Sequence, residues 1–227
     1  MSTQEDEKRL AGLAAAEQVR DGMVLGLGSG TTVYFFLEEL GRRVKSGLHV
    51  SGVPTSERTA GLAREFGIPL STLDEHQELG LDVDGADEVD PHLNLIKGRG
   101  GALLREKIIA RAARRRVIVV DGSKLSSTLG TRATLPVEVV PFAKALAIKG
   151  LTELGAKPVL RVGGDGSPFV TDNGNWILDC VFEPMSDPGR IEAQINRVPG
   201  VVENGLFIGL ADEVLVARAG SIERLTN

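Results

Sequence analysis

The sequence predicts an α/β protein in which a mostly parallel sheet, with helices on both faces, is joined to a smaller α+β unit. Three observations predict this fold. Short apolar runs alternate with helix-like segments through residues 1–130, glycines follow several of these runs, and from residue 131 strand-like runs follow one another more closely. Strands that alternate with helices form parallel sheets, because the crossover helices cover both faces.

The first part of the chain begins with a helix-like segment at 3–19 that has a threonine at its start, as helix N-termini prefer. A short apolar strand at 23–27, a glycine-rich turn and a helix at 32–44 then form a βα unit. The remaining predicted elements are strands at 49–53, 68–73, 81–83 and 117–120 and helices at 56–66 and 102–113. We expect a Rossmann-like domain over residues 1–130.

The second part has a different order of elements. Its predicted elements are strands at 137–140, 158–162, 169–171 and 176–181 and helices at 143–154 and 189–197. A βαββα order favours a ferredoxin-like α+β domain with an antiparallel sheet, which we expect over residues 131–204. The tail at 205–218 is again rich in strand-forming residues, so residues 205–227 are expected to complete the first domain.

Composition excludes several classes of protein. The 227 residues are 42% hydrophobic and 25% charged, which is too apolar for a disordered chain and typical of a globular one. The single cysteine, Cys180, excludes a disulfide scaffold, and its strand-like surroundings predict a buried, unreactive thiol.

Charge and hydropathy indicate where the protein works. The net charge of −5 disfavours nucleic acid and anionic lipid, and the one basic run, Arg111–Arg116, is interpreted as the last turn of a helix. The start of the chain is acidic and polar, unlike a signal peptide, and no apolar run approaches the roughly 20 residues of a membrane span. We therefore expect a cytoplasmic protein.

Glycines are concentrated where predicted strands end. The chain has 28, whereas an average usage of about 7% gives roughly 16. Three of them belong to Gly26-Leu-Gly-Ser-Gly-Thr-Thr32, between the first predicted strand and its helix. Glycines let backbone N–H groups converge on an anion, and a helix N-terminus and hydroxyl groups add to the attraction. This motif favours a phosphate site, and the alternative is a tight turn between strand and helix.

The same motif disfavours nucleotide cofactors. A dinucleotide-binding loop has a third glycine where this chain has Thr31, and an acid after the second strand where it has Val53-Pro-Thr-Ser56. A P-loop requires a Gly-Lys pair, which the sequence lacks. We expect a small phosphorylated metabolite and no cofactor.

Five acids lie within nine residues at the end of another predicted strand, in the segment 82–90. Like charges this close repel one another, so some of them are expected to have a function. Asp84 and Asp87 are candidates for binding sugar hydroxyls. Two alternatives stay open: Mg²⁺ or Ca²⁺ binding, although the spacing of an EF-hand is absent, and capping of a helix or turn by Asp87 or Glu88.

A third cluster is Lys97-Gly-Arg-Gly-Gly-Ala-Leu-Leu-Arg-Glu-Lys107, in which glycines again precede a predicted helix. The positions three and four residues from Glu106 are all apolar, so this carboxylate is expected to face the interior or a pocket. Glu106 is therefore a candidate general base, and the alternative is a buried ion pair. Lys124, which follows a fourth strand end, is either an anion clamp or a loop lysine.

Four ordered motifs together resemble the type A ribose-5-phosphate isomerase family. They are Gly26-Leu-Gly-Ser-Gly-Thr-Thr32, Asp84-Gly-Ala-Asp-Glu88, Lys97-Gly-Arg-Gly-Gly-Ala-Leu-Leu-Arg-Glu-Lys107 and Asp121-Gly-Ser-Lys124. Segments at 135–141, 170–175 and 199–202 match the second half of the family, so the resemblance covers nearly the whole chain.

The resemblance implies an aldose-ketose isomerase that acts on ribose 5-phosphate through an enediolate, with Glu106 as proton acceptor. The catalytic residues that it implies are Glu106, Asp84, Asp87 and Lys97. The substrate-binding residues that it implies are Lys8, Ser29, Gly30, Thr31, Thr32, Asp84, Gly85, Ala86, Asp87, Lys97, Gly98, Arg99, Gly100 and Lys124. Two positions depart from the family pattern: Arg99 replaces a frequent glycine, and Thr31 stands where serine is common.

Other classes of protein lack a matching feature. A sugar-phosphate-sensing regulator needs a pair of DNA-binding helices, and a dehydrogenase needs the absent acid after the second strand. An amino-sugar-phosphate deaminase and a coenzyme A transferase are closer alternatives. We expect a sugar phosphate as the small-molecule partner and no metal, nucleic acid or membrane. Apolar strands in the second domain suggest a homodimer or higher homo-oligomer.

Overall fold

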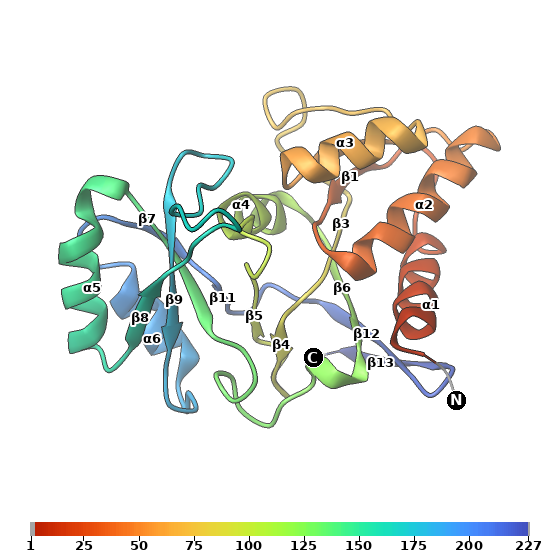
Figure 1. The fold of residues 1–227 in the computed structure, drawn as a ribbon. Coiled ribbons are helices and arrows are strands. Elements are labelled where there is room, and N and C mark those ends of the chain that lie inside the picture. Colours follow the sequence, from red (N-terminus) through yellow and green to blue (C-terminus); the bar gives the residue numbers. More distant parts are fainter. Residues whose placement is uncertain (1–2, 227) are drawn as a thin grey trace. The chain divides into compact units, whose positions relative to one another are not determined.

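The computed structural model describes residues 3–226, which form two compact units (Figure 1). Of the described residues, the first unit contains 3–86, 105–124 and 209–226, and the second contains 87–104 and 125–208. The expected domain boundaries at 130 and 204 stay a prediction, which limited proteolysis can test.

The first unit has a six-stranded sheet in the order β13-β12-β6-β3-β1-β2. Its strands are β1 (Val24–Leu27), β2 (Ser51–Pro54), β3 (Leu81–Asp84), β6 (Arg116–Asp121), β12 (Glu213–Arg218) and β13 (Ser221–Thr226). Neighbouring strands are parallel except for the antiparallel pair β12 and β13. The strand-rich tail therefore returns to the first sheet, as predicted.

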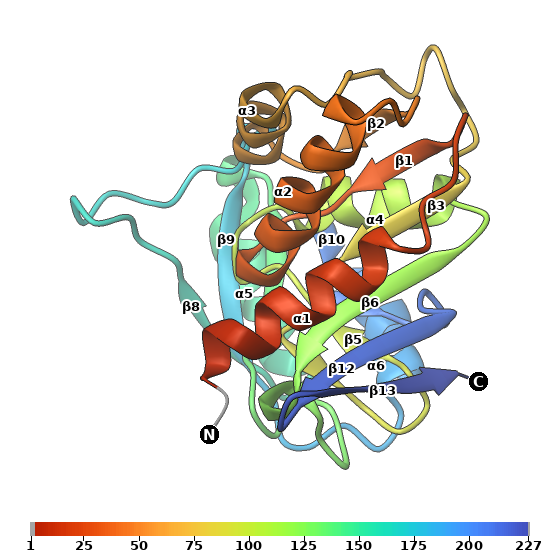
Figure 2. The same cartoon turned by 90° about the vertical axis from the view of Figure 1, so that its right-hand side faces the viewer.

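Helices cover both faces of this sheet, which confirms the predicted fold class. They are α1 (Gln4–Ala16), α2 (Thr31–Lys45), α3 (Glu57–Phe66) and the part of α4 (Leu103–Ala112) that belongs to this unit. Figure 2 shows α1 and α2 over one face, where Leu25 and Leu27 of β1 enter the core. Gly26 points to the other face, because a Cβ on it would lie 2.4 Å from Cγ2 of Ile109 in α4.

Helix α1 begins where its capping residue predicts. Thr3 Oγ1 accepts a hydrogen bond from the backbone N–H of Asp6, and the Asp6 carboxylate accepts one from the backbone N–H of Thr3. This reciprocal pair satisfies two N–H groups that an uncapped helix would leave without partners. No helix within residues 3–226 is long and apolar enough to cross a membrane.

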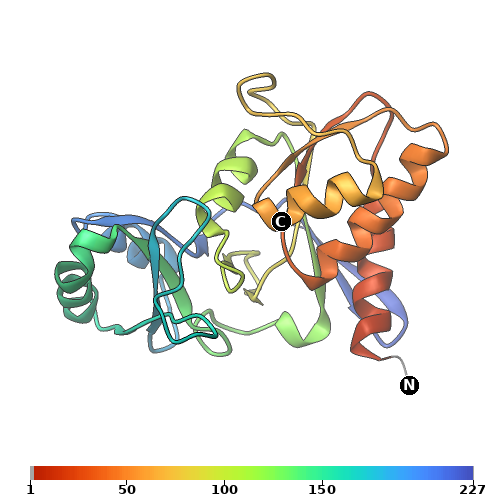
Figure 3. The ribbon, with the colours of Figure 1, turned by 45° about the horizontal axis from the view of Figure 1, so that its top comes forward.

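The second unit contains a four-stranded antiparallel sheet in the order β10-β7-β9-β8. Its strands and helices are β7 (Leu135–Val139), α5 (Lys144–Glu153), β8 (Lys157–Leu160), β9 (Trp176–Val181), α6 (Pro188–Ile195) and β10 (Val201–Asn204). This βαββαβ order with the first strand between the third and the fourth is the ferredoxin-like arrangement that the sequence predicts. In Figure 3, α5 is the blue-green helix at the far left, beside these strands.

Several short elements were not expected. Three two-residue strands, β4 (Glu88–Val89), β5 (Leu95–Ile96) and β11 (Leu206–Phe207), form a sheet of their own, and two 3-10 turns, η1 (Gly122–Lys124) and η2 (Pro141–Ala143), follow β6 and β7. A strand of two residues is too short to show the alternation of apolar and polar residues by which a strand is predicted. Conversely, the strands predicted at 68–73 and 169–171 are wrong: each segment makes only an isolated bridge, at Leu70 and Val170.

Candidate functional site

The predicted phosphate loop lies at the carboxyl end of β1 and leads into α2. Gly30 has φ +122, a conformation that favours glycine, and its carbonyl accepts the first backbone hydrogen bond of the helix, from Tyr34 N–H. The backbone N–H groups in the first turn of α2, before Tyr34, have no acceptor within the helix, and they lie at the positive end of the helix dipole. The loop therefore presents donors for an anion, as the glycines and hydroxyls predict.

Asp84, at the end of β3, holds this loop in place. Its side chain is 1% exposed, and its Oδ1 accepts hydrogen bonds from the backbone N–H groups of Ser29 (3.0 Å) and Gly85 (2.7 Å). A Cβ on Gly28 would lie 2.3 Å from the same oxygen, so only glycine fits there. Asp84 is a predicted sugar-binding residue, and its Oδ1 thus stabilises the loop through hydrogen bonds to the backbone.

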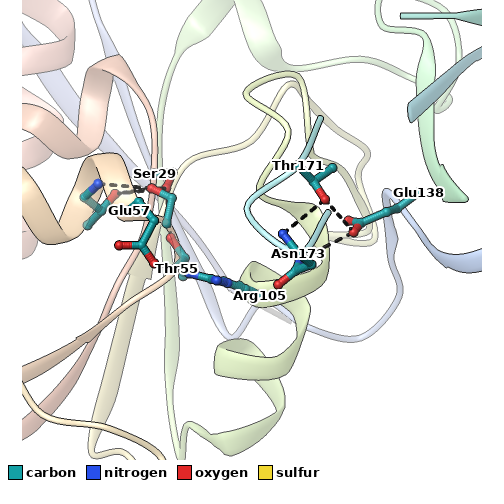
Figure 4. A network of polar contacts seen from close by, with 9 residues as sticks. Ser29, Thr55, Glu57, Arg105, Glu138, Thr171 and Asn173 are labelled. Carbon is teal, nitrogen blue, oxygen red and sulfur yellow. Dashed lines mark hydrogen bonds and ion pairs between the residues drawn. The ribbon is translucent and has the colours of Figure 1, made fainter. Parts of the chain in front are cut away.

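The hydroxyl of Ser29 lies inside a cluster of hydroxyls that sequence reasoning missed (Figure 4). Its Oγ is 2.8–2.9 Å from Thr55 Oγ1, Ser56 Oγ and Thr59 Oγ1. A hydroxyl has one proton and two lone pairs, so these three contacts occupy it fully. Thr59 also donates to the carbonyl oxygen of Gly28 (2.9 Å). The cluster positions the loop, and the pair Thr55-Ser56 after a strand was the signal available for it.

A cavity of about 580 Å³ lies beside this loop. Its lining includes Gly28, Ser29, Gly30 and Thr31 of the loop, Gln4, Glu5, Lys8 and Arg9 of α1, and Arg58 and Thr59 of α3. Arg9 is paired with Glu38 (2.8 Å). Among residues 3–226, no carboxylate lies within ion-pair distance of Lys8 or Arg58. Glu5 and Glu38 also line the cavity, so its charged side chains leave a small positive excess. Sequence reasoning did not find Arg58, because a lone arginine in a helix is usually solvated.

Glu106 lies in the first turn of α4 and is 5% exposed, which confirms that it faces the interior. The preceding residue, Arg105, pairs with Glu57 at the start of α3 (2.9 Å) and joins the beginnings of the two helices (Figure 4). Lys107 and Asp82 are buried in the same unit, although no sequence pattern predicts that either lies inside. Burial of these charged groups requires partners, and it marks this part of α4 as polar and enclosed.

Lys97 follows β5 in the second unit and is 3% exposed. Its backbone N–H donates to the carbonyl oxygen of Gly205 (2.9 Å), and its Nζ lies 5.3 Å from the centre of the Phe207 ring. Lys97 is therefore a firmly held cation. Asp87 belongs to the same unit, where its Oδ2 accepts a hydrogen bond from the backbone N–H of Arg99 (2.9 Å).

The loop after Lys97 needs glycine at two of its positions. Gly98 has φ +101 and Gly101 has φ +84, and a Cβ on Gly101 would lie 2.5 Å from the ring of Phe169. Arg99 has no positive φ, so its departure from the family glycine costs no backbone strain. Two backbone N–H groups of this loop have acceptors within the protein: Arg99 N–H binds Asp87, and Gly101 N–H donates to the carbonyl oxygen of Gly98.

The remaining acids of the 82–90 run hold turns. Both carboxylate oxygens of Glu88 accept hydrogen bonds, from the backbone N–H groups of Gly130, Thr131, Arg132 and Ala133 at 3.0–3.2 Å. Asp90 accepts from the backbone N–H groups of His92 and Asn94. The turn-capping alternative is therefore confirmed for Glu88. Residues 3–226 contain no group of three or more His, Cys, Asp or Glu side chains arranged to hold a metal ion.

Lys124 ends η1, just after β6, and does not line the cavity. Beside it, burial alone would raise the pKa of Asp121, but hydrogen bonds from Ser123 and Gln4 lower it overall. Cys180 is buried in β9, and this burial raises the pKa of its thiol to about 12. The prediction of a buried cysteine is thus confirmed, and its low reactivity stays a prediction.

The fold and the site define a class: an α/β protein with a glycine-rich loop at the carboxyl end of a strand of a mostly parallel sheet and a buried carboxylate on a helix over one face. Residues 51–221 match the model of the family ribose 5-phosphate isomerase A (phosphoriboisomerase A). The chain belongs to the ribose 5-phosphate isomerase A family of enzymes.

Curated relatives and solved structures agree with this assignment. The chain is 52% identical to ribose-5-phosphate isomerase A of Roseiflexus castenholzii, over 96% of this chain and 94% of that one. It is also 52% identical to the protein of that name from Gloeobacter violaceus, over 96% and 95% of the two chains. The solved ribose 5-phosphate isomerase A of Methanocaldococcus jannaschii superposes with a TM-score of 0.95 at 42% identity, covering 99% of this chain and 100% of that chain. A second solved isomerase, in complex with phospho-erythronic acid, gives a TM-score of 0.97 at 42% identity, with the same coverage.

Proposed function

We propose that this protein interconverts D-ribose 5-phosphate and D-ribulose 5-phosphate, the isomerisation in the non-oxidative branch of the pentose phosphate pathway. The observation that carries the proposal is the cavity at the glycine loop, which holds two cations without carboxylate partners in a chain of this family. A sugar phosphate supplies the dianion that such a cavity attracts. The relative solved with phospho-erythronic acid, a phosphorylated sugar acid, supports the same substrate class.

The phosphate binds, in this proposal, to segment 29–32 and the cations beside it. The backbone N–H groups at the start of α2 and the hydroxyls of Thr31 and Thr32 donate to its oxygens, and Lys8 and Arg58 supply charge. Ser29 contributes its backbone, because its hydroxyl is occupied within the protein. Lys124 and the backbone of Gly85 and Ala86 complete the proposed set of substrate contacts in this unit.

Glu106 is the proposed base. It removes the proton from C2 of the open-chain aldose and returns it to C1, while the hydroxyl proton of O2 passes to O1. The product is then a ketose, and no electron acceptor is consumed. Glu106 is 5% exposed, so the proposed base is largely shielded from water. General base catalysis of this kind contributes about 10²- to 10⁴-fold in rate.

The second unit supplies the proposed stabilisation of the enediolate. Lys97 and the backbone N–H groups of Gly98 and Gly100 are the proposed partners of the developing oxyanion. Asp87 binds sugar hydroxyls together with Asp84 and helps to move hydroxyl protons when the furanose ring opens. Lys97 is buried, so its charge acts in a medium of low dielectric constant, where it is stronger than in water.

A coupled assay tests the activity directly. We expect ribulose 5-phosphate to form from ribose 5-phosphate, and amino-sugar phosphates and acyl-coenzyme A substrates to remain unchanged. Turnover of one of those two instead would replace the proposal with the deaminase or the transferase. Activity should survive exhaustive chelation, and loss of activity that Mg²⁺ restores would support the metal-binding alternative for Asp84 and Asp87.

We further propose that the protein assembles as a homodimer or higher homo-oligomer through its second unit. Of the large apolar side chains that are exposed within residues 3–226, all but Ile108 belong to this unit, and Phe142 is 99% exposed. Exposed apolar side chains gathered on one unit are typical of an interface. Light scattering should give at least twice the mass of 24.1 kDa. The variant pair Phe142→Ser and Val159→Ser should lower that mass, and a wild-type monomer would contradict the proposal.

A cytoplasmic location is proposed on the sequence arguments, together with a free, buried cysteine that reducing conditions preserve. Cell fractionation tests it, and recovery in a membrane or secreted fraction would contradict it.

A further inference from the structure

Arg161 forms hydrogen bonds to the loop that follows Lys97. It comes directly after β8, and its backbone is fixed on both sides: its N–H donates to the carbonyl oxygen of Ile177 and its own carbonyl accepts from Phe169, each at 2.9 Å. Its side chain is 14% exposed. The position of the guanidinium is therefore set by the sheet of the second unit.

The guanidinium donates hydrogen bonds to two different kinds of partner, a carboxylate and two backbone carbonyl groups. Nε and Nη2 donate to the two oxygens of Asp179 in β9 (2.9 and 2.5 Å). Nη1 donates to the carbonyl oxygens of Gly98 (3.2 Å) and Arg99 (3.0 Å). Asp179 thus fixes the plane of the guanidinium, and the remaining nitrogen holds two consecutive carbonyls of the loop.

Peptide geometry converts these two bonds into a direction for two N–H groups. In a planar trans peptide the N–H points away from the C=O of the same unit. The carbonyl of Gly98 shares its unit with Arg99 N–H, and the carbonyl of Arg99 shares its unit with Gly100 N–H. Both N–H groups must therefore point away from Arg161. The first of them does so, because it meets Asp87 Oδ2 at 2.9 Å.

The second of these groups is available for a ligand. Among residues 3–226 no acceptor meets the N–H of Gly100, and a Cβ on Gly100 would find nothing within 4 Å. The ring of Phe169 packs against the loop at Gly101, and its centre lies 5.6 Å from the guanidinium carbon of Arg161. The loop is thus clamped on one side and open on the other.

We propose that Arg161 is a positioning residue for the isomerisation: by holding the carbonyls of Gly98 and Arg99, it aims Gly100 N–H at the enediolate oxygen. The inference rests on the proposed function, because it presumes that the loop after Lys97 stabilises the oxyanion. It predicts an effect on kcat rather than on KM, since the phosphate contacts lie in other segments of the chain.

Arg161→Lys is the test, because lysine keeps the charge but lacks the planar fork. We expect kcat to fall about 10- to 100-fold with little change in KM. This is less than the roughly 10²- to 10³-fold cost of removing an oxyanion donor, because the N–H is misdirected rather than absent. Binding of phospho-erythronic acid, whose carboxylate carries negative charge as the enediolate does, should weaken by a similar factor. Asp179→Asn, which keeps an acceptor but removes the counter-charge, should give a smaller effect in the same direction.

The matched control is Arg116→Lys. Arg116 forms a similar bidentate pair with Asp212 (both contacts 2.8 Å). Arg116 lies at the amino end of β6, whereas the predicted phosphate loop follows the carboxyl end of β1. We expect it to lower the melting temperature about as much as Arg161→Lys and to leave kcat within about twofold.

Two further results separate the possible failures. If Lys97→Ala is inactive while Arg161→Lys and Asp179→Asn both keep the wild-type kcat, the positioning role is wrong and the proposed function stands. If Lys97→Ala keeps the wild-type kcat, the proposed role of Lys97 at the oxyanion is wrong. If the wild-type protein does not isomerise ribose 5-phosphate, the proposed function itself is wrong. Should Arg161→Lys fail to fold, Asp179→Asn alone decides between these results.

Discussion

Asp84 accepts a hydrogen bond from the backbone N–H of Ser29 at 3.0 Å, so a carboxylate at the end of β3 holds the loop that follows β1. The two residues are 55 positions apart in the chain, and the parallel pairing of β1 with β3 brings their strand ends together. A group expected to bind sugar therefore also shapes the phosphate loop. We therefore expect sugar binding and loop geometry to be coupled at this position.

Replacing Asp84 with alanine should affect both stability and binding. The substitution removes the acceptor of two backbone N–H groups, which costs about 1–3 kcal/mol in the free energy of unfolding. It should also raise KM for ribose 5-phosphate about tenfold or more, because the loop is released. Chemical denaturation and steady-state kinetics measure the two effects. Asp90→Ala, which removes a comparable acceptor from a turn in the second unit, should lower stability alone. Equal KM values for the two variants would contradict the coupling.

Two glycine substitutions should change stability in opposite directions. Gly61 lies within α3, and a Cβ on it would meet nothing within 4 Å, so Gly61→Ala should stabilise the protein by about 0.5–1 kcal/mol through helix propensity. On Gly26 a Cβ would lie 2.4 Å from Ile109 and 2.5 Å from Asp82, so Gly26→Ala should destabilise it by about 1–3 kcal/mol. Urea unfolding compares them, and a stabilising Gly26→Ala would refute the close packing of β1 against α4.

The carboxylate of Asp121 should make stability depend on pH. Burial acts to raise its pKa, but the hydrogen bonds from Ser123 and Gln4 prevail, so its folded pKa lies below the ordinary value of 3.8. A lowered folded pKa stabilises the protein above the unfolded pKa, and that contribution is lost as the pH falls through the folded pKa. Asp121→Asn should therefore be less stable than wild type at neutral pH, and the difference should shrink in acid. Denaturation across the pH range tests this, and a constant difference would argue against it.

Cys180 should resist alkylation in the folded protein. With a thiol pKa of about 12 and full burial, almost no thiolate is present at about pH 8. Iodoacetamide should leave the native protein unmodified and label it rapidly in denaturant, as mass spectrometry would show. Rapid labelling of the native enzyme would mean that β9 opens or that the thiol is accessible.

Much of the fold could be predicted because its signals are local. The glycine-rich turn after β1 and the apolar neighbours of Glu106 each lie within a few residues, and the structure places both as expected. The Ser29 cluster was missed because its partner hydroxyls follow about 30 residues later, at the end of a different strand. Parallel pairing of β1 and β2 brings these hydroxyls together, and periodicity does not indicate which hydroxyls will meet.

The site could be predicted by residue type but not by hydrogen-bond partner. Glu88 and Asp87 are adjacent acids after the same strand, yet Glu88 binds four backbone N–H groups of a distant turn and Asp87 binds the loop after Lys97. Arg161 gave no signal in the sequence, because its partners include two carbonyl groups, which every residue carries. A contact to a backbone carbonyl does not depend on the residue type of the partner, so the sequence does not predict it.

The most direct test of the central claim is the kinetic behaviour of Glu106→Gln. Glutamine keeps the size of the side chain but cannot accept the C2 proton, so kcat should fall about 10²- to 10⁴-fold. Calorimetry should show near wild-type affinity for phospho-erythronic acid, and the exposed Glu65→Gln in α3 should behave as wild type. A Glu106→Gln enzyme that isomerises ribose 5-phosphate at the wild-type rate would contradict the assignment of Glu106 as the base.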